Sequence, residues 1–209
     1  MNQVSAVQVG DVIENSFSGE KMVFLQTAAE TNGELLQIDL FVRPGGAVFG
    51  EHVHPQQSER FVVKSGTITL RANGRELQVQ AGEEFTVPPQ TAHVWWNKGE
   101  EELNVLLEFR PAGDFAEFVT TMFAWAQAGK PEVKGLVDLA RYAVIDRKYS
   151  HVLQATNPPR LVQKLLFTLL YPLGRLLGFQ PDFRYKAKKG SVLEPQRTSQ
   201  GTVSLRHSA

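Results

Sequence analysis

The sequence of residues 46–66 is GAVFGEHVHPQQSERFVVKSG, and it carries the strongest structural information in this chain of 209 residues. His52 and His54 are separated by one valine, and side chains two residues apart on an extended strand project to the same face. Glu59 follows after a proline that permits a bend, so it can return on the next strand. With His93, three of the chain's five histidines and one carboxylate fall where facing strands can gather them.

Residues 7–110 have the pattern of short β-strands separated by turns. Asn32-Gly33, Asn73-Gly74 and Ala81-Gly82 are turn sequences between runs rich in β-branched and aromatic residues. The predicted strands are residues 21–27, 35–42, 60–63, 67–71, 76–79, 84–87, 93–96 and 103–109. Because no helical pattern separates these strands, an all-β sandwich or barrel is favoured.

Two spaced motifs resemble the signatures of the cupin superfamily. The first consists of Gly46, His52, His54, Glu59 and Gly66, and the second of Gly82, Pro88, His93 and Asn97. The second departs from the family pattern at Gln90, where cupins usually have glycine, so a tight turn must form there without glycine. The resemblance covers roughly residues 35–112. It implies an all-β cupin jelly-roll β-barrel, and the helical pattern that follows adds a C-terminal α-helical extension.

By that resemblance, His52, His54, Glu59 and His93 bind one divalent metal inside the barrel. Three neutral imidazoles and one carboxylate suit a first-row transition metal better than calcium or magnesium. We expect iron or manganese, with zinc, nickel and copper left open. Four ligands leave two free positions on an octahedral ion, whereas on tetrahedral zinc they can leave none. The alternative is a barrel that has lost its metal. The presence of all four ligand types argues against this alternative.

Strand parity predicts the wall of the pocket. Phe61 shares the face of Glu59, and Trp95 shares the face of His93, so both either line the pocket or belong to the core. Glu108 lies opposite to the apolar face of its strand, where it either serves the pocket as an acid or base or meets solvent. We favour solvent slightly for Glu108. The sequence identifies no catalytic residue.

The pattern changes to helices after Pro111. The first predicted helix begins at an Asp114 cap and ends before Gly129, the second covers about 136–152, and the third follows Pro158-Pro159 to about Leu177. The predicted organisation is a barrel over residues 1–112, a helical extension over 113–180 that packs on the barrel or on a partner subunit, and a basic, extended or disordered tail over 181–209.

The third predicted helix is apolar over most of its surface. Its narrow polar stripe consists of Arg160, Lys164, Thr168, Tyr171 and Arg175. Such a helix must be covered. We rank packing within the chain or in a dimer first, contact with a membrane surface second, and a cap over the barrel mouth third. The cupin resemblance also implies a homodimer.

The net charge of zero conceals an acidic body and a basic end. Residues 1–113 hold fifteen acidic and eight basic residues, giving −7, and residues 151–209 hold two acidic and nine basic residues, giving +7. We favour the interpretation that the basic end lies against the acidic body of this chain or of a partner. The short basic cluster lacks interleaved aromatic residues, so we predict no nucleic-acid partner.

Two classes of function remain open. The first is a metal-dependent enzyme acting on a small organic molecule, with oxygenase (oxidoreductase) chemistry ahead of isomerase, cyclase or lyase chemistry. The second is a non-catalytic protein that binds or senses a small molecule and has a structural metal. The absence of cysteine excludes disulfide scaffolds, cysteine–zinc sites and thiol catalysis. Because no signal peptide is evident, we expect a cytoplasmic protein.

Overall fold

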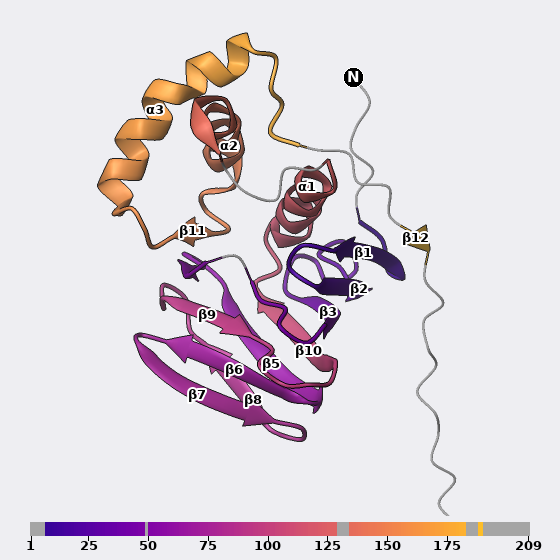
Figure 1. Cartoon of the computed structure of the whole chain (residues 1–209). Helices are drawn as coiled ribbons and strands as arrows, with labels where there is room; N and C mark the ends of the chain where they lie inside the picture. The colour runs from indigo at the N-terminus through magenta and orange to yellow at the C-terminus, as the bar shows by residue number, and fades with distance from the viewer. Residues whose placement is uncertain (1–6, 49, 129–133, 183–187, 190–209) are drawn as a thin grey trace, which may run out of the picture.

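The computed structural model describes residues 7–48, 50–128, 134–182 and 188–189. Within these residues, twelve strands form two antiparallel sheets, with the helices on one side of them (Figure 1). The seven-stranded sheet has the order β12 (Lys188–Lys189), β1 (Asp11–Asn15), β2 (Glu20–Gln26), β3 (Leu36–Val42), β10 (Leu103–Arg110), β5 (Ser58–Ser65) and β8 (Glu84–Val87). The five-stranded sheet has the order β11 (Gln154–Ala155), β4 (His52–Val53), β9 (His93–Trp96), β6 (Thr67–Ala72) and β7 (Arg75–Gln80).

The predicted jelly roll is confirmed, but it is not a closed barrel. Within the described residues, no named strand of one sheet pairs with a strand of the other. The core lies between the sheets because alternate residues of each strand face inward. Phe24, Ile38 and Val105 are completely buried. Glu59, Phe61 and Val63 also alternate inward along β5, as the parity argument predicted.

The turn at Gln90 forms without glycine. Gln90 adopts a left-handed backbone conformation, with φ of 63°. Its backbone N–H donates a hydrogen bond of 2.8 Å to the carbonyl oxygen of His54. The departure from the family signature is therefore accommodated by a strained glutamine that connects the two motifs.

In the part of the chain that the structure describes, three helices come after β10: α1 (Phe115–Gln127), α2 (Gly135–Tyr149) and α3 (Arg160–Leu176). Strand β11 lies between α2 and α3, and β12 follows α3. The three helices were predicted, but the proposed side-chain cap by Asp114 was wrong. Asp114 makes no capping hydrogen bond, and its carboxylate lies 3.0 Å from His151 Nε2 instead. Gly129 and most of the predicted tail lie outside the described residues. In that tail, Lys188–Lys189 pairs with Asp11 and Val12 as β12.

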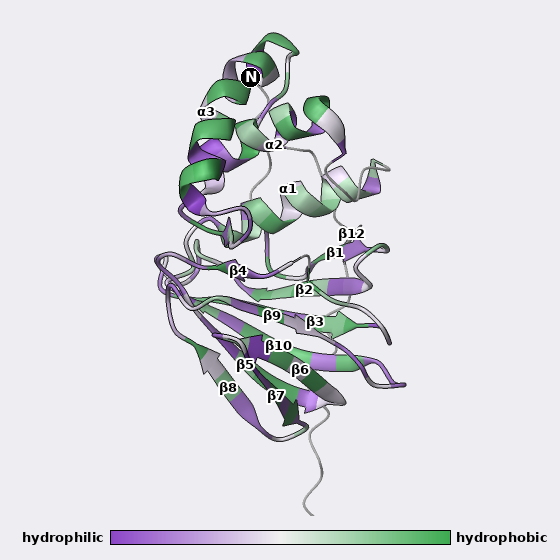
Figure 2. Cartoon of the chain, turned by 60° about the vertical axis from the view of Figure 1, so that its left-hand side comes forward, coloured by the Kyte–Doolittle hydropathy of each residue, from purple (hydrophilic) through white to green (hydrophobic). Residues whose placement is uncertain are grey.

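The helical extension packs unevenly. α1 buries ten of its thirteen residues, whereas α3 buries only Gln163, Phe167, Leu170 and Gly174, a face that lies against α2. A side chain at Gly174 would collide with the carbonyl oxygen of Ala140, so the two helices meet at close range. Leu161, Leu165, Leu169 and Leu176 are exposed on α3, and Figure 2 shows its hydrophobic outer side. None of the helices described here is long and apolar enough to cross a membrane.

After α2 the chain returns to the five-stranded sheet. Gln154 and Ala155 of β11 pair with Val53 and His52 of β4, at the edge of that sheet. A segment of the extension therefore completes the sheet beside the first histidine motif. The boundary between residues 1–112 and 113–180 stays a prediction.

Candidate metal centre

The four predicted ligands converge between the two sheets. His52, His54, Glu59 and His93 are all buried, and one potential ligand atom from each lies within 4.8 Å of the others. His52 on β4 pairs directly with His93 on β9, whereas Glu59 approaches from β5 in the facing sheet. His54 lies just beyond β4, where its ring centroid is 5.1 Å from that of His52. The cluster is thus assembled by the packing of one sheet on the other.

Backbone carbonyls orient all three imidazoles. The Nδ1 atoms of His52, His54 and His93 lie 3.1, 2.9 and 2.9 Å from the carbonyl oxygens of Gly50, Val152 and Thr91 respectively. A carbonyl oxygen can only accept a hydrogen bond, so each Nδ1 carries a proton, and in the neutral form of each imidazole Nε2 then offers its lone pair. This is the outer-shell arrangement typical of histidines that bind metals through Nε2.

The inner atoms of the cluster fit a divalent cation. His93 Nε2 lies 2.7 Å and His54 Nε2 lies 3.4 Å from the same Glu59 oxygen, Oε2. His54 Nε2 is buried and has no hydrogen-bond partner among the described parts of the chain. A buried nitrogen without a partner is costly, and a cation bound at the centre would satisfy it. The residues therefore suit a borderline first-row metal.

The cluster also shifts the protonation of its own members. Burial lowers the pKa of His52 to about 3, and the neighbouring His54 and His93 act in the same direction. Burial alone would raise the pKa of Glu59, but the nearby His54 and His93 outweigh it, so this pKa is well below its usual range. Burial opposes protonation of His93, but Glu59 outweighs it and raises that pKa. A neutral His52 and an ionised Glu59 are the forms that bind metals.

The helical extension contributes to the candidate metal centre through its backbone. The carbonyl oxygen of Val152, which follows α2, is the group that orients His54. The pairing of β11 with β4 holds this segment in place. Sequence analysis did not find this contact, because the two residues are 98 positions apart and a backbone carbonyl has no sequence motif.

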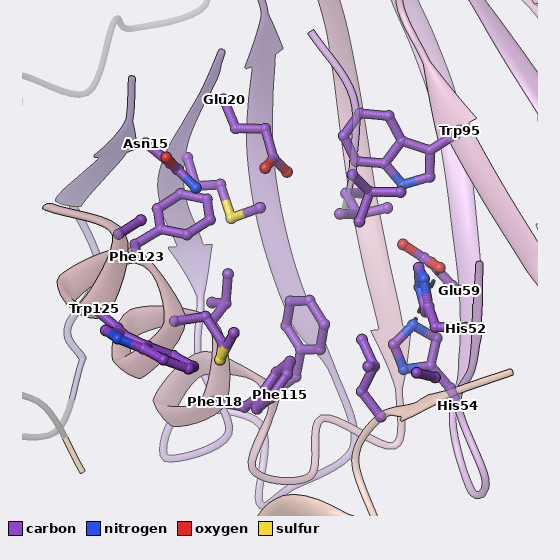
Figure 3. Close-up of a pocket in the computed structure, with 18 of the residues that line it drawn as sticks. Asn15, Glu20, His52, His54, Glu59, Trp95, Phe115, Phe118, Phe123 and Trp125 are labelled. Atoms are coloured by element: carbon purple, nitrogen blue, oxygen red, sulfur yellow. Dashed lines mark ion pairs between the residues drawn. The ribbon is translucent and has the colours of Figure 1, made fainter. Parts of the chain in front are cut away.

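A cavity of about 360 Å³ opens from the cluster toward α1 (Figure 3). His52, His54 and Glu59 line it on one side. Most of its wall is apolar, and the extension supplies much of that wall through Phe115, Phe118, Val119, Met122, Phe123 and Trp125 of α1. Its volume lies in the range of about 300–1,000 Å³ found for small-molecule sites.

The three predicted pocket residues have different positions. Trp95 lines the cavity. Phe61 does not line it; this side chain is completely buried in the core, with its ring centroid 6.5 Å from that of Trp95. Glu108 does not line it either. It accepts hydrogen bonds from Gln37 (2.7 Å) and Arg60 (3.1 Å), and these partners keep it only 6% exposed rather than free in solvent.

Sequence analysis missed two polar residues of the cavity, Asn15 and Glu20. They are 2% and 5% exposed respectively. Burial raises the pKa of Glu20 to about 7, and the charge of Glu59 acts in the same direction. Parity could have placed Glu20, because Glu20, Met22 and Phe24 alternate inward along β2. The predicted strand began one residue too late to include it.

The strand region of the chain matches a known protein family. Residues 40–108 match the family model described as Cupin domain. No curated protein sequence matches the chain. An RmlC-like cupin from Shewanella frigidimarina NCIMB 400 is 25% identical, with 55% of this chain and 99% of that one covered and a TM-score of 0.44. A predicted oxalate decarboxylase from Thermotoga maritima is 19% identical, with 53% and 99% covered and a TM-score of 0.45.

A third similar structure is KdgF from Halomonas sp., which is 17% identical, with 49% of this chain and 90% of that one covered and a TM-score of 0.43. These alignments extend over about half of the present chain. The match to the family model coincides with the strands that carry the metal cluster, and helices follow from Phe115 onward. Residues 40–108 are therefore a cupin domain, and a helical extension follows from Phe115 onward.

Proposed function

We propose that this cupin is a metal-dependent enzyme that acts on a small organic molecule in the cavity beside the cluster. The observation that carries the proposal is that His52, His54 and Glu59 belong both to the buried ligand cluster and to the cavity wall. A molecule in the cavity would therefore meet the metal directly. We propose dioxygenase-like chemistry first, and isomerase, cyclase or lyase chemistry next.

We propose iron or manganese as the metal, one ion per chain. When bound, such an ion supplies Lewis-acid or redox chemistry. The residues of the chain hold it, orient the substrate and exclude water. Phe115 and Phe118 of α1 close the side of the cavity that faces the extension, where a mostly apolar wall disfavours water and strengthens polar interactions at the cluster.

The test begins with elemental analysis of protein purified without added metal. Iron or manganese near one ion per chain would support the proposal. Oxygen uptake and product formation are then measured with iron- and manganese-loaded protein and a panel of phenolic and diketone compounds, with Glu59→Gln as the inactive control. Turnover that requires the metal is expected. Binding of a panel compound without any conversion, for every loaded metal, would overturn the enzyme in favour of a non-catalytic binding or sensing protein.

We propose further that the protein is a homodimer. The exposed leucines of α3 support this, since four large apolar side chains at 61–86% exposure form one face (Leu161, Leu165, Leu169 and Leu176). Light scattering should give the mass of two chains for the wild type and of one chain for Leu165→Glu/Leu169→Glu. Thr168→Glu, which places a charge at an exposed polar position of the same helix, is the control.

A monomeric wild type would overturn the dimer. Binding of that monomer to anionic lipid vesicles would then favour the peripheral membrane contact instead. The cytoplasmic location stays a prediction.

A further inference from the structure

We propose that Asn15 and Glu20 form a second polar subsite in the cavity, and that this subsite binds a neutral hydroxyl or amide group of an elongated, otherwise apolar ligand. The proposal deepens the proposed function and rests on it, because the other end of the ligand would meet the metal. In Figure 3 the two residues lie on the opposite side of the cavity from His52, His54 and Glu59, and the carboxyl group of Glu20 points inward.

The two residues are paired by the sheet. Asn15 on β1 lies directly opposite Glu20 on β2 in the antiparallel register. Glu20 is only 5% exposed, and among the residues that the structure describes it has no ion-pair partner. Its polar neighbour is Ser18, which lowers the pKa of Glu20 but less than burial raises it. A buried carboxyl group without a cation is costly unless something else meets it. Because the carboxyl group of Glu20 points into the cavity, a polar group of a bound ligand can form a hydrogen bond with it.

Asn15 supplies the complementary donor. Its Oδ1 accepts hydrogen bonds from the backbone N–H groups of Phe17 (3.1 Å) and Ser18 (3.4 Å). These bonds fix the direction of the amide and leave its NH₂ group as the part that can donate to a ligand. Asn15 and Glu20 together therefore present a donor and a carboxyl group side by side.

The wall between the two polar regions is apolar. Met22, Phe118, Met122 and Phe123 line the cavity together with the metal cluster and with Glu20. Aromatic and thioether side chains favour an aromatic or aliphatic ligand body over a sugar or a polyphosphate. The cavity therefore fits a molecule that is polar at both ends and apolar in the middle.

The chemistry of the subsite determines which polar group it accepts. A hydroxyl or amide both donates and accepts, so it can satisfy the carboxyl group of Glu20 and the NH₂ group of Asn15 at once. A carboxylate would place a second negative charge beside Glu20, within a cavity that also contains Glu59. The subsite should therefore select against acidic ligands, since like charges in a poorly solvated site repel strongly.

The test uses three catechols that share one ring and one spacer length and differ only at the tail, which ends in a methyl, a hydroxyl or a carboxylate group. Affinities are measured by calorimetry with the full chain loaded with Fe(II) under argon, at pH 8.5. The wild type should bind the hydroxyl-tailed catechol about tenfold more tightly than the carboxylate-tailed one. Glu20→Gln, which keeps a donor and an acceptor but removes the charge, should reduce this preference to less than about threefold.

Glu34→Gln is the matched control, because it makes the same chemical change at an exposed position. It should leave the preference unchanged, and metal content and thermal unfolding should show that both variants are loaded and folded. Equal binding of the hydroxyl- and carboxylate-tailed probes by the wild type, an unchanged preference in Glu20→Gln, or no binding of any probe would overturn the subsite. Intact selectivity without turnover would overturn the proposed enzyme and leave the subsite standing.

Discussion

Glu59 and Glu20 line the same cavity and are almost equally buried, yet their acidities shift in opposite directions. The nearby His54 and His93 outweigh burial at Glu59 and lower its pKa. At Glu20, burial outweighs the opposing effect of Ser18 and raises the pKa to about 7. The same residue type therefore provides an ionised candidate metal ligand on one side of the cavity. On the other side, near neutral pH, it provides a carboxyl group that is partly protonated and partly ionised.

This difference indicates that the two sides of the mostly apolar cavity have different roles. A metal is attracted to the side where negative charge is stabilised by groups that can also act as ligands. The other side can exchange a hydrogen bond with a ligand at little electrostatic cost. The same substitution, glutamate to glutamine, can be made at each position to test whether the two sides of the cavity differ in this way.

The largest effect is expected from Glu59→Gln. Glu59 is the only carboxylate of the cluster, so its replacement removes the negative charge that attracts the cation. Substitution of residues that only hydrogen-bond to metal ligands typically reduces metal affinity by about 10–100-fold, and loss of a ligand should cost more. We expect a loss of more than about 100-fold, measured by competition with a chelator. Glu20→Gln should bind the metal as tightly as the wild type. If both variants lose metal affinity equally, Glu20 also contributes to metal binding and the two sides of the cavity do not have different roles.

The metal-free form of Glu59→Gln should also be less stable than the metal-free wild type at neutral pH. The pKa of Glu59 is lowered on folding, so its contribution to stability is present above the usual glutamate value of 4.5 and is lost as the pH falls through the folded value. Urea unfolding at pH 7 measures this difference. A variant as stable as the wild type would show that the imidazoles do not stabilise the carboxylate.

Glu20→Gln should have the opposite effect on stability. Because the pKa of Glu20 rises from 4.5 to about 7 on folding, the folded state holds its proton over a pH range in which the unfolded state has lost it. Stability therefore falls as the pH rises through this range, by up to about 3 kcal/mol.

The measurement is urea unfolding of both metal-free proteins at pH 4.5 and pH 8. Titration of the histidine cluster is common to the two and cancels in the difference. Relative to wild type, Glu20→Gln should gain stability at pH 8. A pH-independent difference would mean that Glu20 ionises normally.

The smallest effect is expected at the turn that supports the metal side. Gln90 has a φ of 63°, a conformation that glycine adopts without strain. Gln90→Gly should therefore stabilise the metal-free protein by about 1 kcal/mol, seen as a higher midpoint of thermal unfolding, while metal affinity is unchanged. Gln56→Gly is the control, because Gln56 is exposed and has no positive φ, and it should not stabilise the protein.

Local patterns in the sequence predicted the strands β2, β3 and β5 to β10 and the three helices, but not β1, β11 or β12. The four residues of the cluster were inferred from the resemblance of two motifs to the cupin signatures. Alternation with a period of two marks which residues of β5 and β9 face inward, and the spacing of the histidine motifs reflects one fixed strand geometry. These features depend on neighbours close in the chain, so they can be derived without coordinates. The pocket wall was different, since Phe61 has the correct parity but lies in the core.

Contacts between distant segments required the tertiary structure. Val152 reaches His54, α1 closes the cavity, and Glu20 faces the cluster only because the sheets and helices pack in one particular arrangement. The direction of a pKa shift belongs to the same category, because it depends on which charges lie within a few ångströms and on how much water remains. The amino-acid order therefore determined which chemical groups were available on each strand, and packing decided which of them share a space, because long-range proximity has no local periodicity.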